Sequence, residues 1–133
     1  MRYIDLHVHS NCSDGTFSPE ELVVLGIKQE LVAFALTDHD TISGVERAIK
    51  KAEEFDNKIQ VIPGMELSCK YLLSSSQSVE IHMLGYRYDI HNKKLIATLE
   101  DISNERDERN RKMCSNLQNA GFPISYDMLC ERF

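Results

Sequence analysis

Histidines and acids recur along the first two thirds of this sequence in positions that suit metal binding. His7 and His9 are two residues apart, so an extended backbone points both imidazoles to the same side. Imidazole and carboxylate groups are ligands for divalent metals such as Zn, Fe, Mn and Ni. The candidate metal ligands are His7, His9, Asp14, His39, Glu66 and His82.

Six ligands are more than one tetrahedral ion needs, so we expect two to three divalent ions, with Mn, Zn or Fe as candidates. Adjacent ions activate a bridging water and hold the oxygens of a phosphate during displacement. Asp38 and Asp40 flank His39, and we expect them to accept N–H bonds from ligand imidazoles.

Each candidate ligand also has a simpler interpretation when it is taken alone. A single histidine in a strand, such as His82, is commonly a core residue, and Asp14-Gly15 is a common turn sequence. Glu66 could merely end a strand. Their joint occurrence at expected strand ends favours a shared site, whereas His91, in a polar loop, is expected to lie outside it.

Alternating strands and helices would position these side chains. Apolar runs predict strands at 3–8, 31–37, 60–67 and 79–88. Two capping-box patterns, which begin at Ser18 and Ser43, predict helices over 18–30 and 43–55. This alternation predicts an α/β fold with a mostly parallel sheet. Because the carboxyl ends of parallel strands meet on one face, we expect the ligands to meet there.

From residue 92 the pattern changes to helical spacing of apolar residues. It continues to a stop at Gly121-Phe122-Pro123, after which Ser125 is expected to cap a last short helix. We therefore predict two domains, an α/β portion at 1–91 with the metal ligands and a helical insertion or subdomain at 92–133.

Two arginines interrupt the apolar stripe of this long helix. Arg106 and Arg109 fall near the angular position of Ile102, and Arg111 falls on the opposite side. One interpretation is a bidentate clamp for a substrate phosphate. The other is that both arginines pair with neighbouring acids at the surface. Arg111 is expected to be solvated.

Length and composition exclude several classes of protein. The 133 residues, 42% apolar and 27% charged, fit one soluble globular body. No run approaches the roughly 20 apolar residues of a membrane span, and the first residues do not resemble a secretory signal. A net charge of −6 offers no general surface for nucleic acid or membrane. Four cysteines without a CxxC pair indicate no disulfide framework, so we expect a cytoplasmic protein.

Five motifs in these segments follow one another in a recognisable order. They are Asp5-Leu6-His7-Val8-His9-Ser10, Ser13-Asp14-Gly15, Thr37-Asp38-His39-Asp40-Thr41, Pro63-Gly64-Met65-Glu66 and His82-Met83-Leu84-Gly85-Tyr86. Together they resemble the PHP (polymerase and histidinol phosphatase) family of metal-dependent phosphoesterases. The resemblance implies the N-terminal part of a distorted (β/α)7 barrel with a trinuclear metal site and a helical insertion.

The resemblance also implies roles for individual residues. A metal-bridging hydroxide would attack phosphorus. The ligands would divide among three ions: His7, His9 and Glu66 for the first, Asp14 and His39 for the second, and Glu66 with His82 for the third.

A helical Arg-x-x-Arg-Asn-Arg run after the His82 strand is similar to the branch that acts on nucleoside 3′,5′-bisphosphates and RNA 5′ ends. The resemblance therefore implies substrate binding by Arg106 and Arg109. The expected partner is a small phosphorylated substrate, a nucleotide or a short RNA 5′ end, and neither membrane nor duplex nucleic acid.

The sequence departs from the family pattern in its second half. The family takes a further His and an Asp-x-His pair from there, whereas this sequence has no histidine after His91. We therefore expect the N-terminal part of a larger protein, with little activity by itself. Two alternatives stay open, an amidohydrolase-type metal hydrolase, whose barrels also begin with His-x-His, and a non-catalytic truncated PHP module.

Overall fold

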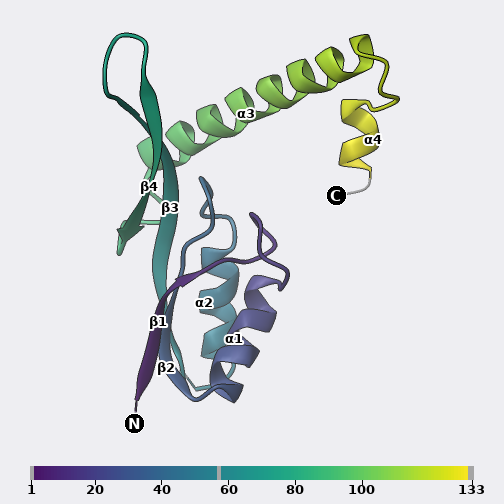
Figure 1. The fold of residues 1–133 in the computed structure, drawn as a ribbon. Helices are drawn as coiled ribbons and strands as arrows, with labels where there is room; N and C mark the ends of the chain where they lie inside the picture. Colours follow the sequence, from purple (N-terminus) through teal and green to yellow (C-terminus); the bar gives the residue numbers. More distant parts are fainter. Residues whose placement is uncertain (1, 57, 132–133) are drawn as a thin grey trace. The chain divides into compact units, whose positions relative to one another are not determined.

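The computed structural model describes residues 2–56 and 58–131, and its contacts divide the chain into two compact units, Met1–Asn92 and Lys93–Phe133. The first unit is built on a four-stranded sheet whose strands lie side by side in sequence order (Figure 1). Its strands are β1 (Tyr3–Val8), β2 (Leu31–Leu36), β3 (Gln60–Leu72) and β4 (Ser78–Tyr86).

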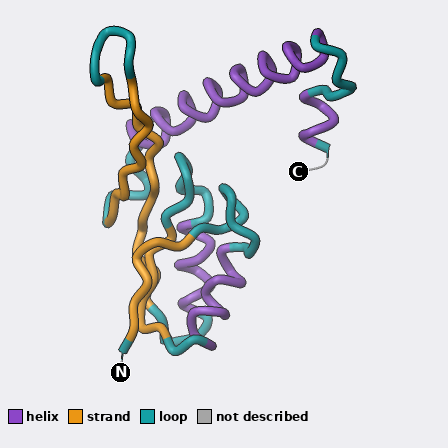
Figure 2. Tube along the Cα trace, viewed as in Figure 1, coloured by secondary structure: helices purple, strands orange, loops and turns teal. Residues whose placement is uncertain are grey.

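Two kinds of strand pairing make up this sheet. β1 pairs parallel with β2, and β2 pairs parallel with β3, as the alternation of strands and helices predicts. β3 and β4 form an antiparallel hairpin that runs on past the parallel strands (Figure 2). The connection at 73–77 is too short for the crossover that a parallel strand needs. The fourth strand therefore departs from the parallel arrangement expected for it.

Helix α1 (Pro19–Lys28) starts at the predicted capping box, and helix α2 (Val45–Glu53) does not. The Ser18 side chain accepts a bond from the Glu21 N–H, and the Glu21 carboxylate accepts one from the Ser18 N–H. At α2 the capping residue is Gly44, with no side-chain cap. The Ser43 backbone N–H instead bonds to the Thr41 hydroxyl, because a local turn competes for these polar groups.

The core lies where α1 and α2 pack on the sheet. Helix residues such as Val23 and Ala48 are fully buried against Phe34 and Leu36 of β2. This packing fixes β2 firmly, so the segment that follows β2 has a rigid support.

The strands at the two edges of the sheet are much more exposed. Tyr3 and Ile4 of β1 are 54% and 57% exposed. These side chains are therefore apolar but are not buried by the described part of the chain. In β4, Ile81 and Met83 are exposed as well. The apolar residues of β1 and β4 are therefore poor guides to the core, which lies against β2.

The second unit is helical. Helix α3 (Lys93–Asn119) ends in a Schellman turn in which Gly121 has φ 91° and the Phe122 N–H bonds to the Leu117 carbonyl. Helix α4 (Tyr126–Cys130) is capped by Ser125, as predicted. The Tyr126 hydroxyl donates to Asp107 at 2.8 Å, and the Arg111 guanidinium lies 4.0 Å from the centre of the Tyr126 ring. Arg111 therefore packs on an aromatic ring while its side chain stays exposed, which agrees with the expectation that it is solvated.

None of the helices in the described part of the chain has the length and apolar character needed to cross a membrane.

Candidate metal centre

The candidate ligands lie on four segments that the sheet brings together. His7 is in β1 and His9 directly follows it, while Asp14 lies in the loop between β1 and α1. His39 follows β2 and forms an isolated parallel bridge with Glu66 of β3. The sixth candidate, His82, lies in β4.

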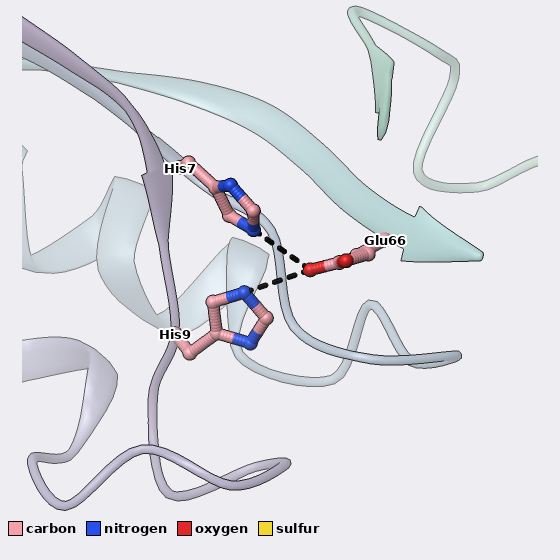
Figure 3. A group of neighbouring side chains, drawn as sticks. All are labelled: His7, His9 and Glu66. Atoms are coloured by element: carbon pink, nitrogen blue, oxygen red, sulfur yellow. Dashed lines mark hydrogen bonds and ion pairs between the residues drawn. The ribbon is translucent and has the colours of Figure 1, made fainter. Parts of the chain in front are cut away.

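Glu66 is the centre of this group. One carboxylate oxygen, Oε2, lies 2.7 Å from His7 Nε2 and 3.0 Å from His9 Nε2 (Figure 3). The other oxygen, Oε1, lies 3.0 Å from His82 Nδ1. The Glu66 side chain is only 8% exposed, so its two oxygens face imidazoles in place of water.

Asp14 extends the group on the loop side. Its Oδ1 lies 3.0 Å from His9 Nδ1, and its Oδ2 lies 3.7 Å from His39 Nε2. The same His39 nitrogen is 3.8 Å from Glu66 Oε2. His39 therefore lies between the loop carboxylate and the strand carboxylate.

These distances define three overlapping sets of donors, each with its ligand atoms within 4.8 Å of one another. The sets are His7, His9 and Glu66, then His9, Asp14 and His39, then His39, Glu66 and His82. The structure thus brings all the predicted ligands into one cluster. The first set is the one implied by the resemblance, whereas the second and third contain one further histidine each, His9 and His39.

The donor chemistry of the cluster fits metal ions. His9 Nδ1 and His39 Nδ1 are buried and have no hydrogen-bond partner in the described structure, which is uncommon for buried polar atoms. His9 Nδ1 faces Asp14 Oδ1 at 3.0 Å without a hydrogen-bonding orientation. Two ligands of one ion have this relation, because both direct lone pairs at a common point.

The imidazoles lower the pKa of both carboxyl groups. Burial by itself raises the pKa of Glu66, but the hydrogen bond from His7 and the charges of His39 and His7 outweigh it, so the pKa lies below its ordinary value. For Asp14, burial again raises the pKa, and the charges of His9 and His39 lower it further than burial raises it. Both carboxyl groups are therefore ionised near neutral pH, which is the form that binds metal.

His82 reaches the cluster by a different route from the one expected. It was expected at the carboxyl end of a parallel strand, but it lies in the antiparallel hairpin opposite Ser68. Glu66 is opposite Leu84, so His82 and Glu66 are diagonal neighbours on one face of the hairpin. The hairpin register, and not a parallel strand end, therefore places this imidazole.

Asp38 and Asp40 have partners other than those expected. Asp38 accepts bonds from the Ser10 N–H and from the Ser10 and Ser13 hydroxyls, each at 2.7 Å. Asp40 Oδ1 accepts a bond from the Ser68 N–H at 2.8 Å. The donors to Asp38 come from the loop after β1 and none of them is an imidazole, so the expectation is corrected for Asp38, whereas for Asp40 it stays a prediction. Ser10 and Ser13 stand in two of the motifs quoted above, but the sequence assigned neither serine a role.

The remaining singled-out residues lie elsewhere. His91 follows a turn in which its N–H bonds to Asp89, and it belongs to none of the donor sets among the described residues. Arg106 and Arg109 lie in α3 of the second unit, Arg106 half-buried and Arg109 exposed. Arg109 lines a pocket of about 550 Å³ together with Arg111 and Lys112.

Two relatives are similar to nearly all of this chain. A 5′-3′ exoribonuclease of Haemophilus influenzae is 37% identical over 92% of the chain, and a 3′,5′-nucleoside bisphosphate phosphatase of Chromobacterium violaceum is 32% identical over 96% of it. In both cases this chain spans 42% of the relative's length.

A solved structure shares the fold. It is an amidohydrolase from Chromobacterium violaceum with bound sulfate and no metal, and it is 32% identical with a TM-score of 0.77. The match covers 93% of this chain and 41% of that one. The curled α/β sheet of the first unit therefore corresponds to part of a larger fold.

The PHP domain family matches residues 5–122 of the sequence. That span includes every residue of the three donor sets and extends through α3. The chain belongs to the PHP domain family.

Proposed function

We propose that this chain supplies the metal-binding part of a metal-dependent phosphoesterase that hydrolyses phosphomonoesters of nucleotides or short RNA. The observation that carries the proposal is the convergence of four imidazoles and two carboxylates in three overlapping donor sets. The names of the two relatives support the choice of substrate, since one acts on RNA from the 5′ end and the other on nucleoside bisphosphates.

The cluster combines a buried floor with an accessible side. The side chains of Glu66 and His9 are 8% and 18% exposed, whereas those of His7 and Asp14 are 51% and 66% exposed. Two to three bound divalent ions would activate water and neutralise phosphate charge. The buried residues hold the donor geometry, and the exposed side leaves room for a phosphate group to approach.

Glu66 has the most demanding role among these residues. It belongs to two of the three donor sets and offers a separate oxygen to each. A carboxylate in this position would serve as a ligand in both sets. His9 and His39 each belong to two sets as well, so substitution of a shared ligand should affect two sets at once.

Arg106 and Arg109 are proposed to bind substrate phosphate. Guanidinium groups pair with phosphate through two parallel N–H bonds, and Arg106 and Arg109 lie about one turn apart in α3. Arg106→Ala and Arg109→Ala should each raise KM for a nucleoside 3′,5′-bisphosphate. Each lost charge-assisted bond is worth about 1.5–3 kcal/mol. Arg111→Ala is the matched control, because Arg111 packs on Tyr126. An effect confined to Arg111 would exclude the proposed clamp.

The decisive experiment combines metal binding with turnover. Mn²⁺ or Zn²⁺ is titrated into the metal-free chain. Phosphate release from a nucleoside 3′,5′-bisphosphate and from a 5′-phosphorylated short RNA is then measured on the complete protein that contains this chain. Metal binding that needs Glu66 and metal-dependent phosphate release support the proposal. Absence of either result contradicts it.

One observation favours a second candidate function. The similar solved structure is named an amidohydrolase, and amide hydrolysis also uses metal-activated water. The bound sulfate in that structure resembles a phosphate in shape and charge and favours the phosphoesterase. Parallel assays with amide and phosphomonoester substrates at equal metal loading separate the two activities.

A further inference from the structure

The buried carboxylate of Asp38 connects two of the segments that carry candidate ligands. Asp38 is 2% exposed and lies between the end of β2 and His39. Its Oδ1 accepts bonds from the Ser10 N–H and the Ser13 hydroxyl, and its Oδ2 accepts one from the Ser10 hydroxyl, all at 2.7 Å. All three donors come from the loop that leads from His9 to Asp14.

The bonds to Asp38 act on the part of the loop that determines where Asp14 lies. The Ser10 carbonyl accepts bonds from the N–H groups of Ser13 and Gly15, at 3.1 and 2.9 Å, and the Ser10 hydroxyl accepts one from the Cys12 N–H. Ser10 is therefore the hub of a tight turn around Asp14. A side chain at Gly15 would meet the His9 carbonyl oxygen at 2.3 Å, so the turn has little room to change shape.

We infer that Asp38 is a positioning residue for the donor set of His9, Asp14 and His39. Its backbone continues directly into His39, and its carboxylate holds the turn that bears the other two ligands. One side chain thus fixes the separation between the strand-borne imidazole and the loop-borne carboxylate. The inference rests on the metal centre proposed above and adds a residue that touches none of the ions.

The geometry of Asp14 makes such a tether necessary. The Asp14 side chain is 66% exposed, and no strand ladder contains its backbone. A metal site loses affinity when its ligands must be ordered at the moment of binding, because the ordering entropy opposes binding. A buried charge that accepts three hydrogen bonds is a rigid anchor. Removing it frees the loop without changing a ligand.

A double-mutant cycle on Mn²⁺ affinity tests this role. Free Mn²⁺ is followed by electron paramagnetic resonance during titration of wild type, Asp38→Ala, Asp14→Ala and the double variant. Asp38→Ala is expected to weaken binding by up to about tenfold, a loss no larger than that in Asp14→Ala and at the low end of what is usual when residues that orient ligands are removed. If Asp38 acts through Asp14, the Mn²⁺ affinity of the double variant should be at most about threefold weaker than that of Asp14→Ala. Strictly additive losses, or an unchanged affinity in Asp38→Ala, overturn the inference.

Two further variants keep the test informative if Asp38→Ala does not fold. Asp38→Asn retains an oxygen that accepts bonds from the Ser10 N–H and the Ser13 hydroxyl, so it should recover most of the affinity. Ser13→Ala removes one bond from the loop side and should weaken Mn²⁺ binding by a smaller factor. Two results together would contradict positioning through these hydrogen bonds. They are a wild-type Mn²⁺ affinity in Ser13→Ala and a loss of affinity in Asp38→Asn as large as that in Asp38→Ala.

Hydrogen exchange of the metal-free chain gives a readout that does not need an ion. The amides of Ser13 and Gly15 should exchange faster in Asp38→Ala, while those of β3 stay protected. Unchanged loop exchange overturns the inference. If wild type binds no Mn²⁺ but the loop amides respond, the proposed metal function fails while the tether itself is established.

Discussion

Glu66 and Asp14 are the two carboxylates of the cluster, and they are held in opposite ways. Glu66 lies in β3 and is paired on both sides, by the bridge to His39 and by the hairpin with β4. Asp14 lies in a loop, and its side chain is largely exposed. The strand ladder positions the first carboxylate, whereas the second depends on side-chain bonds to Asp38. Strand-borne ligands therefore need fewer supporting side chains than loop-borne ones.

The largest effect is expected from removing the strand-borne carboxylate. Glu66→Ala should reduce Mn²⁺ affinity by about 100-fold or more, because Glu66 contributes to two donor sets and is the buried carboxylate that faces all four imidazoles. His7→Ala should also lower the bound metal. Metal content is measured after dialysis, with His91→Ala as the control. Equal metal content in all three variants would exclude the site.

A smaller effect is expected from removing the loop-borne carboxylate. Asp14→Ala should lower the affinity for one ion about tenfold and leave the binding of metal by His7, His9 and Glu66 in place. The reason is that Asp14 belongs to one donor set only. The number of bound ions per chain and their separate affinities are read from a calorimetric titration. Loss of all metal in Asp14→Ala would show that the two carboxylates are equivalent and would remove the contrast between them.

The free energy of unfolding should depend on pH in acid through the buried carboxylate of Glu66. The pKa of Glu66 is lowered in the folded state from its ordinary value of 4.5, so the unfolded state binds more protons and the stabilisation is present above that value. It is lost as pH falls through the folded-state pKa. The free-energy difference between metal-free wild type and Glu66→Gln should therefore shrink as urea unfolding is repeated below about pH 4.5. A difference that grows in acid would show that folding raises the pKa of Glu66 and does not lower it.

The smallest effect is expected from a side-chain bond on the strand side. The Tyr86 hydroxyl donates to the Leu6 carbonyl at 2.8 Å, next to His7. Tyr86→Phe should cost about 1 kcal/mol of unfolding free energy and change Mn²⁺ affinity less than threefold, because the β1–β2 ladder still holds His7. Urea unfolding and Mn²⁺ titration of the same sample check both values. A loss of affinity as large as in Asp38→Ala would show that strand-borne ligands need tethers too.

The sequence alone predicted the candidate ligands and the course of most elements. The His-x-His spacing, the apolar run before His39 and the capping box at Ser18 depend on neighbouring residues, so local patterns reveal them. The same holds for the Schellman turn at Gly121 and the cap at Ser125. These features follow from backbone geometry and short-range hydrogen bonding.

Only the tertiary structure decided how the ligands meet. The diagonal relation of His82 to Glu66 depends on the register of the hairpin, and the partners of Asp38 are 25 and 28 residues away in the sequence. Arg111 likewise finds the Tyr126 ring through the turn between two helices. Such contacts depend on which distant groups compete for one donor or acceptor, and local spacing carries no information about that competition.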